Sequence, residues 1–144
     1  MITWYTLRNN VIDKHNFSMD KRFAFGKNWK NYLQHSYSPV VYKRAEESML
    51  NFLKGESLEG KTFLDVGCGS GIHSLVAYNL GASRIVSIDY DPDSVACTKG
   101  LAEKENVDNW TVLQGSMLDD DFMRELGTFD FVYCWGVAHH TGDM

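Results

Sequence analysis

Blocks of hydrophobic and polar positions alternate from residue 38 onward, and they predict alternating helices and strands. Apolar residues recur at helical spacing from Val41 to Leu53, after a serine and a proline that suit the start of a helix. Gly55 suits the end of that helix. The apolar run at about 62–66 that follows predicts a buried strand.

The same alternation continues to the end of the pattern. In chain order we expect a helix from Ile72 to Leu80, a strand at 84–89, a helix opened by Asp91-Pro92, a strand at 110–114, a short helix at about 121–126 and a strand at 129–135. Strands alternating with helices are typical of a parallel sheet covered on both faces. The sequence therefore predicts an α/β fold, a Rossmann-like sheet that holds only the first four strands, in a domain at 38–144.

Residues 1–37 form a separate segment that is rich in aromatic residues and irregular in pattern. A free tail would be poor in aromatic residues, so we expect this segment to pack on the domain. A short helix at about 27–34 is weakly indicated. The segment is predicted to be a helical or irregular lid, or simply a cover for the sheet.

The glycine-rich stretch LDVGCGSGIHS follows the first strand and indicates a ligand site. Gly67, Gly69 and Gly71 let a ligand approach the backbone closely, and Asp65 precedes them. A dinucleotide turn has the spacing G-x-G-x-x-G and a P-loop needs G-K-[ST], and neither matches this G-x-G-x-G. A carboxylate at Asp65 would repel a pyrophosphate but accept a hydrogen bond from an ammonium. The spacing therefore favours a cationic ligand that bears an amino acid.

Asp89 ends the second predicted strand and is a second candidate for this site. A carboxylate there typically accepts from both hydroxyls of a ribose. It could instead cap the next helix, but Asp91, before Pro92, suits that role better.

The ordered stretches DVGCGSG, SIDYDPDSV, QGSMLD and FDFVYCWGVAHH resemble the motifs of class I S-adenosylmethionine-dependent methyltransferases, over roughly residues 60–142. The resemblance is closest to the branch that acts on small molecules. It implies S-adenosyl-L-methionine as cofactor, transfer of a methyl group by direct displacement, and a small-molecule acceptor. The motif N-P-P-[FYW] is absent after the fourth strand, which argues against DNA or a glutamine side chain as the acceptor.

The resemblance also implies which residues bind the cofactor. They are Asp65, Gly67, Cys68, Gly69, Gly71, Asp89, Tyr90, Gly115, Ser116, Met117, Cys134 and Trp135. Many members carry an aspartate where Ser116 stands, so the adenine contact here is expected from the backbone, the hydroxyl or Asp119. The helix that begins after Cys68 would lower the pKa of its thiol, although a reactive thiol is not expected at this position.

Two further residues have open roles. Trp29 is predicted to close over the cofactor, where an aromatic face favours a sulfonium, or else to cover the sheet. His140 is the candidate base if the acceptor is a hydroxyl or a carbon acid; a role in shaping the substrate pocket is favoured for the pair His139-His140. Neighbouring histidines without further ligands predict no metal site.

Composition narrows the class of partner. The chain has 144 residues and a formal net charge of −5, which argues against nucleic-acid binding. Three cysteines without a C-x-x-C pair indicate reduced thiols. No secretory signal and no membrane-spanning run is evident, so we expect a soluble, cytoplasmic protein.

The sequence stops at Met144, soon after the predicted fourth strand, whereas members of the family continue for three more strands. An apolar fourth strand at a sheet edge would aggregate unless it is covered. A truncated domain or a homo-oligomer that covers this strand is favoured over cover by the N-terminal segment. Three functions stay open: a small-molecule methyltransferase, a non-catalytic module that binds S-adenosylmethionine or S-adenosylhomocysteine, and a nicotinamide-dependent oxidoreductase, which the glycine spacing and Asp65 disfavour.

Overall fold

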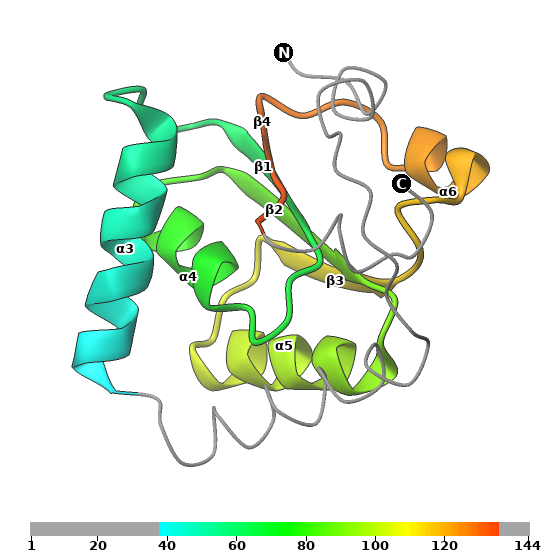
Figure 1. Cartoon of the computed structure of the whole chain (residues 1–144), viewed down its shortest axis with the longest axis horizontal. Coiled ribbons are helices and arrows are strands. Elements are labelled where there is room, and N and C mark those ends of the chain that lie inside the picture. The colour runs from blue at the N-terminus through cyan, green and yellow to red at the C-terminus, as the bar shows by residue number, and fades with distance from the viewer. Residues whose placement is uncertain (1–37, 136–144) are drawn as a thin grey trace, which may run out of the picture.

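The computed structural model describes residues 38–135, and within this range helices and strands alternate (Figure 1). In chain order the elements are α3 (Pro39–Leu53), β1 (Thr62–Val66), α4 (Ile72–Asn79), β2 (Arg84–Asp89), α5 (Pro92–Lys104), β3 (Trp110–Gln114), α6 (Asp120–Glu125) and β4 (Phe131–Tyr133). The predicted alternation is confirmed. The weakly indicated helix at 27–34 lies outside the described residues.

The strands form one four-stranded parallel sheet in the order β3-β2-β1-β4. Strand β1 lies in the interior of the sheet, between β2 and β4, so the segment after β1 leaves the sheet next to the end of β2. The registers place Asp65 opposite Ser87 and Asp89 opposite Gln114. In the described part of the chain β4 is an edge strand, as its predicted position requires.

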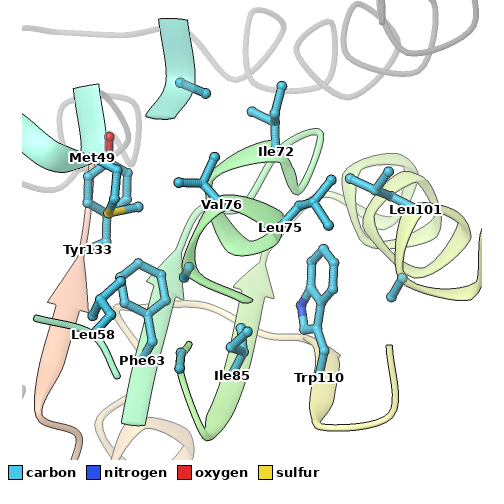
Figure 2. Packing of buried hydrophobic residues seen from close by; sticks show 14 of the residues in the cluster. Met49, Leu58, Phe63, Ile72, Leu75, Val76, Ile85, Leu101, Trp110 and Tyr133 are labelled. Atoms are coloured by element: carbon cyan, nitrogen blue, oxygen red, sulfur yellow. The ribbon is translucent and has the colours of Figure 1, made fainter. Parts of the chain in front are cut away.

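Two hydrophobic clusters cover the two faces of the sheet. The larger one packs α3, α4 and α5 on one face, and Figure 2 shows residues from those helices against Phe63, Ile85 and Trp110 of the strands. The smaller one lies on the other face and includes Met123 of α6 and Phe129. Helices therefore cover both faces, which confirms the predicted Rossmann-like arrangement.

Local sequence explains where the helices begin and end. The Ser38 and Asp91 side chains accept from the backbone N–H groups of Val41 and Ser94, and a proline follows each of them at the first helical position. Helix α3 ends at Leu53, and the next residue, not a glycine, takes the left-handed conformation.

Strand β4 is shorter than the sequence predicts. The pattern suggested 129–135, whereas the ladder covers only Phe131–Tyr133. Asp130 explains the late start, because its carboxylate accepts from the N–H and the hydroxyl of Thr62, and its own N–H donates back to that hydroxyl. These bonds replace regular pairing at the amino end of the strand.

Candidate functional site

The glycine-rich segment leaves the carboxyl end of β1 and leads into α4. Gly67, Gly69 and Gly71 have φ angles of 74°, 53° and 81°, in the left-handed region where a side chain is strained. The N–H groups of Gly67 and Cys68 donate to the carbonyl of Ile88, at 2.8 and 3.0 Å, and this holds the loop against β2. The predicted need for glycine at these positions therefore has a direct structural reason.

Asp89, at the end of β2, faces this loop. Its Oδ2 accepts from the N–H of Gly69 and its Oδ1 from the N–H of Asp91, both at 3.0 Å. The side chain is only half-buried, and partial burial raises the pKa of its carboxyl above the usual range, against these two amide bonds. A carboxylate has about four lone-pair positions, so two amides leave capacity for a ligand. Asp91 caps α5, as predicted.

Thr98 of α5 holds the same loop from the other side. Its hydroxyl donates to the carbonyl of Gly69 at 3.0 Å and lies 3.3 Å from the sulfur of Cys68. A Cβ at Gly71 would stand 2.8 Å from the methyl group of Thr98, closer than packed atoms allow. No sequence signal pointed to this contact between Thr98 and the loop.

The backbone of Gly69 is thus held on both sides. Asp89 accepts a hydrogen bond from its N–H group, and Thr98 donates one to its carbonyl group. A segment with this much backbone freedom needs such bonds to present one conformation to a ligand, because glycine loses the most conformational entropy on ordering. The loop is therefore preorganised by residues from β2 and α5.

Asp65, near the end of β1, is buried and only 3% exposed. Its Oδ2 accepts a hydrogen bond of 2.6 Å from the hydroxyl of Ser74 on α4. Burial raises the pKa of the Asp65 carboxyl to about 7, and the nearby charge of Asp89 adds to the rise, against the Ser74 bond. A group with this pKa changes its charge near neutral pH, so the site can attract a cation to a degree that depends on pH.

Cys68 belongs to the loop, and its side chain is buried. The expectation that the neighbouring helix start would lower the pKa of its thiol is wrong: burial raises that pKa well above the usual value, and Asp65 and Asp89 add to the rise. Desolvation outweighs the helix because the sulfur is surrounded by packed atoms. The thiol stays protonated, in agreement with the expected lack of reactivity.

The segment after β3 lies beside the end of β2. The N–H of Gly115 donates to the carbonyl of Asp89 at 2.9 Å, which places this segment next to the predicted ribose carboxylate. The hydroxyl of Ser116 accepts from the N–H of Leu118, and the side chain of Met117 is buried in the smaller cluster. The alternative adenine contact, Asp119, caps α6 with its carboxylate.

The end of β4 carries the remaining described candidates. Cys134 is half-buried and Trp135 is 70% exposed. Just before them Tyr133 contacts the ring of His73 on α4, with ring centroids 4.9 Å apart. No sequence signal pointed to this pair, since the two residues are far apart in the chain. Burial lowers the pKa of His73 to about 4, so its ring is neutral at pH 7.

The remaining predicted site residues are Tyr90, Trp29 and His140. Tyr90 follows Asp89 and is half-exposed, at the same end of the sheet. Trp29 and His140 lie outside the described residues, and so does the proposed lid at 1–37. Their predicted roles stay predictions.

The groups of this site fit a ribonucleoside that also carries a positive charge. Asp89 offers acceptor oxygens at the tip of β2, and Asp65 places a second carboxyl group on the neighbouring strand. The glycine loop between them is held in one conformation by hydrogen bonds to its backbone. Two carboxylates so close to the loop disfavour a pyrophosphate. This arrangement of sheet, loop and carboxylates defines a class I S-adenosylmethionine-dependent methyltransferase domain.

Comparison with known proteins agrees with that class. A family profile described as a methyltransferase domain matches residues 63–144, more than half of the chain. The chain is 30% identical over 129 residues to the ribosomal protein L11 methyltransferase of Agathobacter rectalis, covering 88% of this chain and 37% of that protein. It is 45% identical over 58 residues to the enzyme of the same name from Aliivibrio fischeri strain MJ11, covering 40% of this chain and 20% of that one.

Solved structures share the fold. The PRMT1 enzyme–prozyme heterotetrameric complex of Trypanosoma brucei with AdoHcy matches with a TM-score of 0.51 and 28% identity, over 72% of this chain and 30% of that chain. The ribosomal protein L11 methylase of Lactobacillus delbrueckii subsp. bulgaricus matches with a TM-score of 0.50 and 24% identity, over 67% of this chain and 46% of that chain. The chain belongs to the methyltransferase domain family. It spans 37% and 20% of the length of the two curated relatives.

The comparisons correct one prediction. The sequence suggested a small-molecule acceptor, whereas the curated relatives are named for a ribosomal protein, so that prediction is wrong. It depended on the absence of an N-P-P motif, which concerns only the amino groups of bases and of glutamine and leaves other protein acceptors open. Within residues 38–135, no helix has the length and apolar character needed to cross a membrane.

Proposed function

We propose that this domain binds S-adenosyl-L-methionine as a methyl donor. Asp89 would accept from the ribose hydroxyls, and the loop at 67–71 would make room for the methionine part. Asp65 would attract the ammonium group, directly or through water. One observation carries this proposal: Asp89 and Thr98 hold the backbone of Gly69 by hydrogen bonds, between two strand ends that each bear a carboxyl group.

The chemistry asks little of the protein beyond placement. When bound, S-adenosylmethionine supplies both an activated methyl group and its own leaving group. The residues of this chain then have to bind the nucleoside, fix its orientation and exclude water from the reacting end. A preorganised loop serves those tasks, because its conformation is already set before the ligand arrives.

We further propose that the acceptor is a protein rather than a nucleic acid. Two observations support this: the relatives carry the name of a ribosomal protein, and the formal net charge of −5 disfavours a polyphosphate partner. Ribosomal protein L11 is the first acceptor to test. A cytoplasmic location would suit such an acceptor.

Calorimetric titration tests the binding proposal. Wild-type protein should bind S-adenosylmethionine and S-adenosylhomocysteine but not NAD. Asp89→Asn should weaken both complexes by about tenfold or more, since it removes a charge-assisted hydrogen bond. Asp108→Asn is the matched control, because that exposed carboxylate stands before β3, near the opposite edge of the sheet. Tight binding of NAD, or equal affinity in Asp89→Asn and wild type, would refute the assignment.

A second experiment separates an enzyme from a binding module. Transfer of a labelled methyl group to ribosomal protein L11 is measured with this chain and with its Asp89→Asn variant. Label on the acceptor that falls in the variant supports a protein methyltransferase. Binding of the donor without any transfer supports the alternative, a non-catalytic module. His140→Ala in the same assay examines the predicted base.

A further inference from the structure

Four buried polar side chains form a continuous chain of hydrogen bonds across the sheet. The indole Nε1–H of Trp110 donates to the hydroxyl of Ser87 at 2.7 Å. The hydroxyls of Ser87 and Ser74 lie 2.6 Å apart, and Ser74 donates to Oδ2 of Asp65 at 2.6 Å. Ser74 and Ser87 are completely buried, and Trp110 is buried in the larger cluster, where Figure 2 shows it beneath Leu75 and Leu101.

The chemistry of its two ends fixes the direction of this chain. An indole N–H can only donate, and an ionised carboxylate can only accept. Each serine hydroxyl has one proton to give, so Ser87 donates to Ser74 and Ser74 donates to Asp65. All three bonds therefore point from β3 toward Asp65, and bonds aligned in this way polarise one another.

The strand register explains how the chain can form. Asp65 and Ser87 are partners in the ladder between β1 and β2, so their side chains stand on the same face of the sheet. Ser74 comes from α4, which covers that face, and Trp110 reaches Ser87 from the next strand. One member comes from each of the three strands, and the fourth comes from the helix.

The groups around Asp65 show why such a chain matters. Burial and the charge of Asp89 disfavour the ionised form of Asp65, and its pKa is about 7. Cys68 in the loop and Tyr133 on β4 stay protonated because burial raises the pKa of each. His73 on α4 is neutral because burial lowers its pKa. None of these four groups is a cation at neutral pH, whereas the Ser74 bond favours the ionised form.

We propose that Ser74, Ser87 and Trp110 are positioning residues that aim one hydrogen bond at Asp65 and keep its carboxylate charged and fixed for the ammonium group of the cofactor. This inference rests on the proposed function. These three residues would act from the interior of the fold. They would set the charge of the Asp65 carboxylate without contacting the ligand themselves.

The test compares variants by NMR and by calorimetry. The carboxyl carbon shift of Asp65 is followed against pH in the wild type, Ser87→Ala and Trp110→Phe. Both variants should raise the pKa of Asp65, because each removes a donor that reinforces the chain. Affinity for S-adenosylmethionine should fall by about threefold to tenfold near pH 7 and recover toward wild type near pH 9. Ser87→Thr, which keeps a hydroxyl, should restore the profile.

The controls separate the possible failures. Ser83→Ala removes an exposed serine before β2 and should change neither profile. A purely structural role for the chain would lower affinity equally at every pH, and that result, or an unchanged Asp65 titration in both variants, would overturn the inference. If the wild type bound no S-adenosylmethionine at any pH, the proposed function would fail, while the NMR titration would still test the chain.

Discussion

The two carboxylates at the strand tips have opposite surroundings. Asp65 on β1 is buried and accepts from the hydroxyl of Ser74, at the end of the chain of hydrogen-bonded side chains. Asp89 on β2 is half-exposed and accepts from two backbone amides, one of them in the glycine loop. Asp65 therefore depends on packed side chains of the interior, whereas Asp89 depends on the conformation of the backbone near the surface.

That difference suggests a division of labour. Asp89 is part of the framework, because removing its oxygens would release the loop. Asp65 adds charge at the expense of stability, because the cost of its burial outweighs the hydrogen bonds that its carboxyl accepts from the hydroxyl and the backbone of Ser74. Functional sites often hold such unfavourable groups, which the rest of the fold then has to support.

The largest expected effect is a gain of stability on neutralising Asp65. Near pH 8 Asp65→Asn should raise the free energy of unfolding by on the order of 2–4 kcal/mol, because the buried charge disappears and an acceptor for Ser74 remains. Asp89→Asn should instead lower it by about 1–2 kcal/mol, since an amide cannot accept from both backbone N–H groups. Urea unfolding measures both. Loss of stability in Asp65→Asn would remove the contrast between the two carboxylates.

The next effect concerns the bond that joins the loop to α5. Thr98→Val keeps the shape of the side chain but leaves the carbonyl of Gly69 without its donor. We expect a loss of about 1–2 kcal/mol in unfolding free energy and weaker binding of S-adenosylmethionine. Thr98→Ser keeps the hydroxyl and serves as the matched control, which should bind more tightly than the valine variant. Equal affinity of the two variants would mean that the hydroxyl does not order the loop.

A third effect is on pH dependence. The folded pKa of His73 is about 4, below the unfolded value, so this residue reduces stability as the pH falls from about 6.5 to about 4. Asp65 acts in the opposite sense: its raised pKa stabilises the fold below about pH 4, and this contribution is lost as the pH rises to about 7. The variant His73→Phe should therefore lose less stability on acidification. The measurement is the free energy of unfolding across this pH range. If stability fell equally with acid in His73→Phe and in the wild type, His73 would not be enclosed by the fold.

The sequence predicted the order and type of the elements because apolar spacing, Ser38-Pro39 and Asp91-Pro92 are local signals. It also located the glycine loop and both carboxylates, since a strand that ends in glycines has few other interpretations. The hydroxyl chain and Thr98 were missed because their partners meet only through register and helix packing. The length of β4 was wrong for a similar reason: a pairing between Asp130 and Thr62, far apart in the chain, sets where it begins.

The most direct test of the central claim uses a ligand that lacks one end. 5′-Methylthioadenosine keeps the ribose but has no amino-acid part, so it can engage Asp89 and cannot engage Asp65. Calorimetry should show that Asp89→Asn weakens binding of both this compound and S-adenosylmethionine, whereas Asp65→Asn weakens binding of S-adenosylmethionine alone. If Asp65→Asn weakened both ligands equally, or affected neither, the two carboxylates would not hold opposite ends of the ligand and the account would be contradicted.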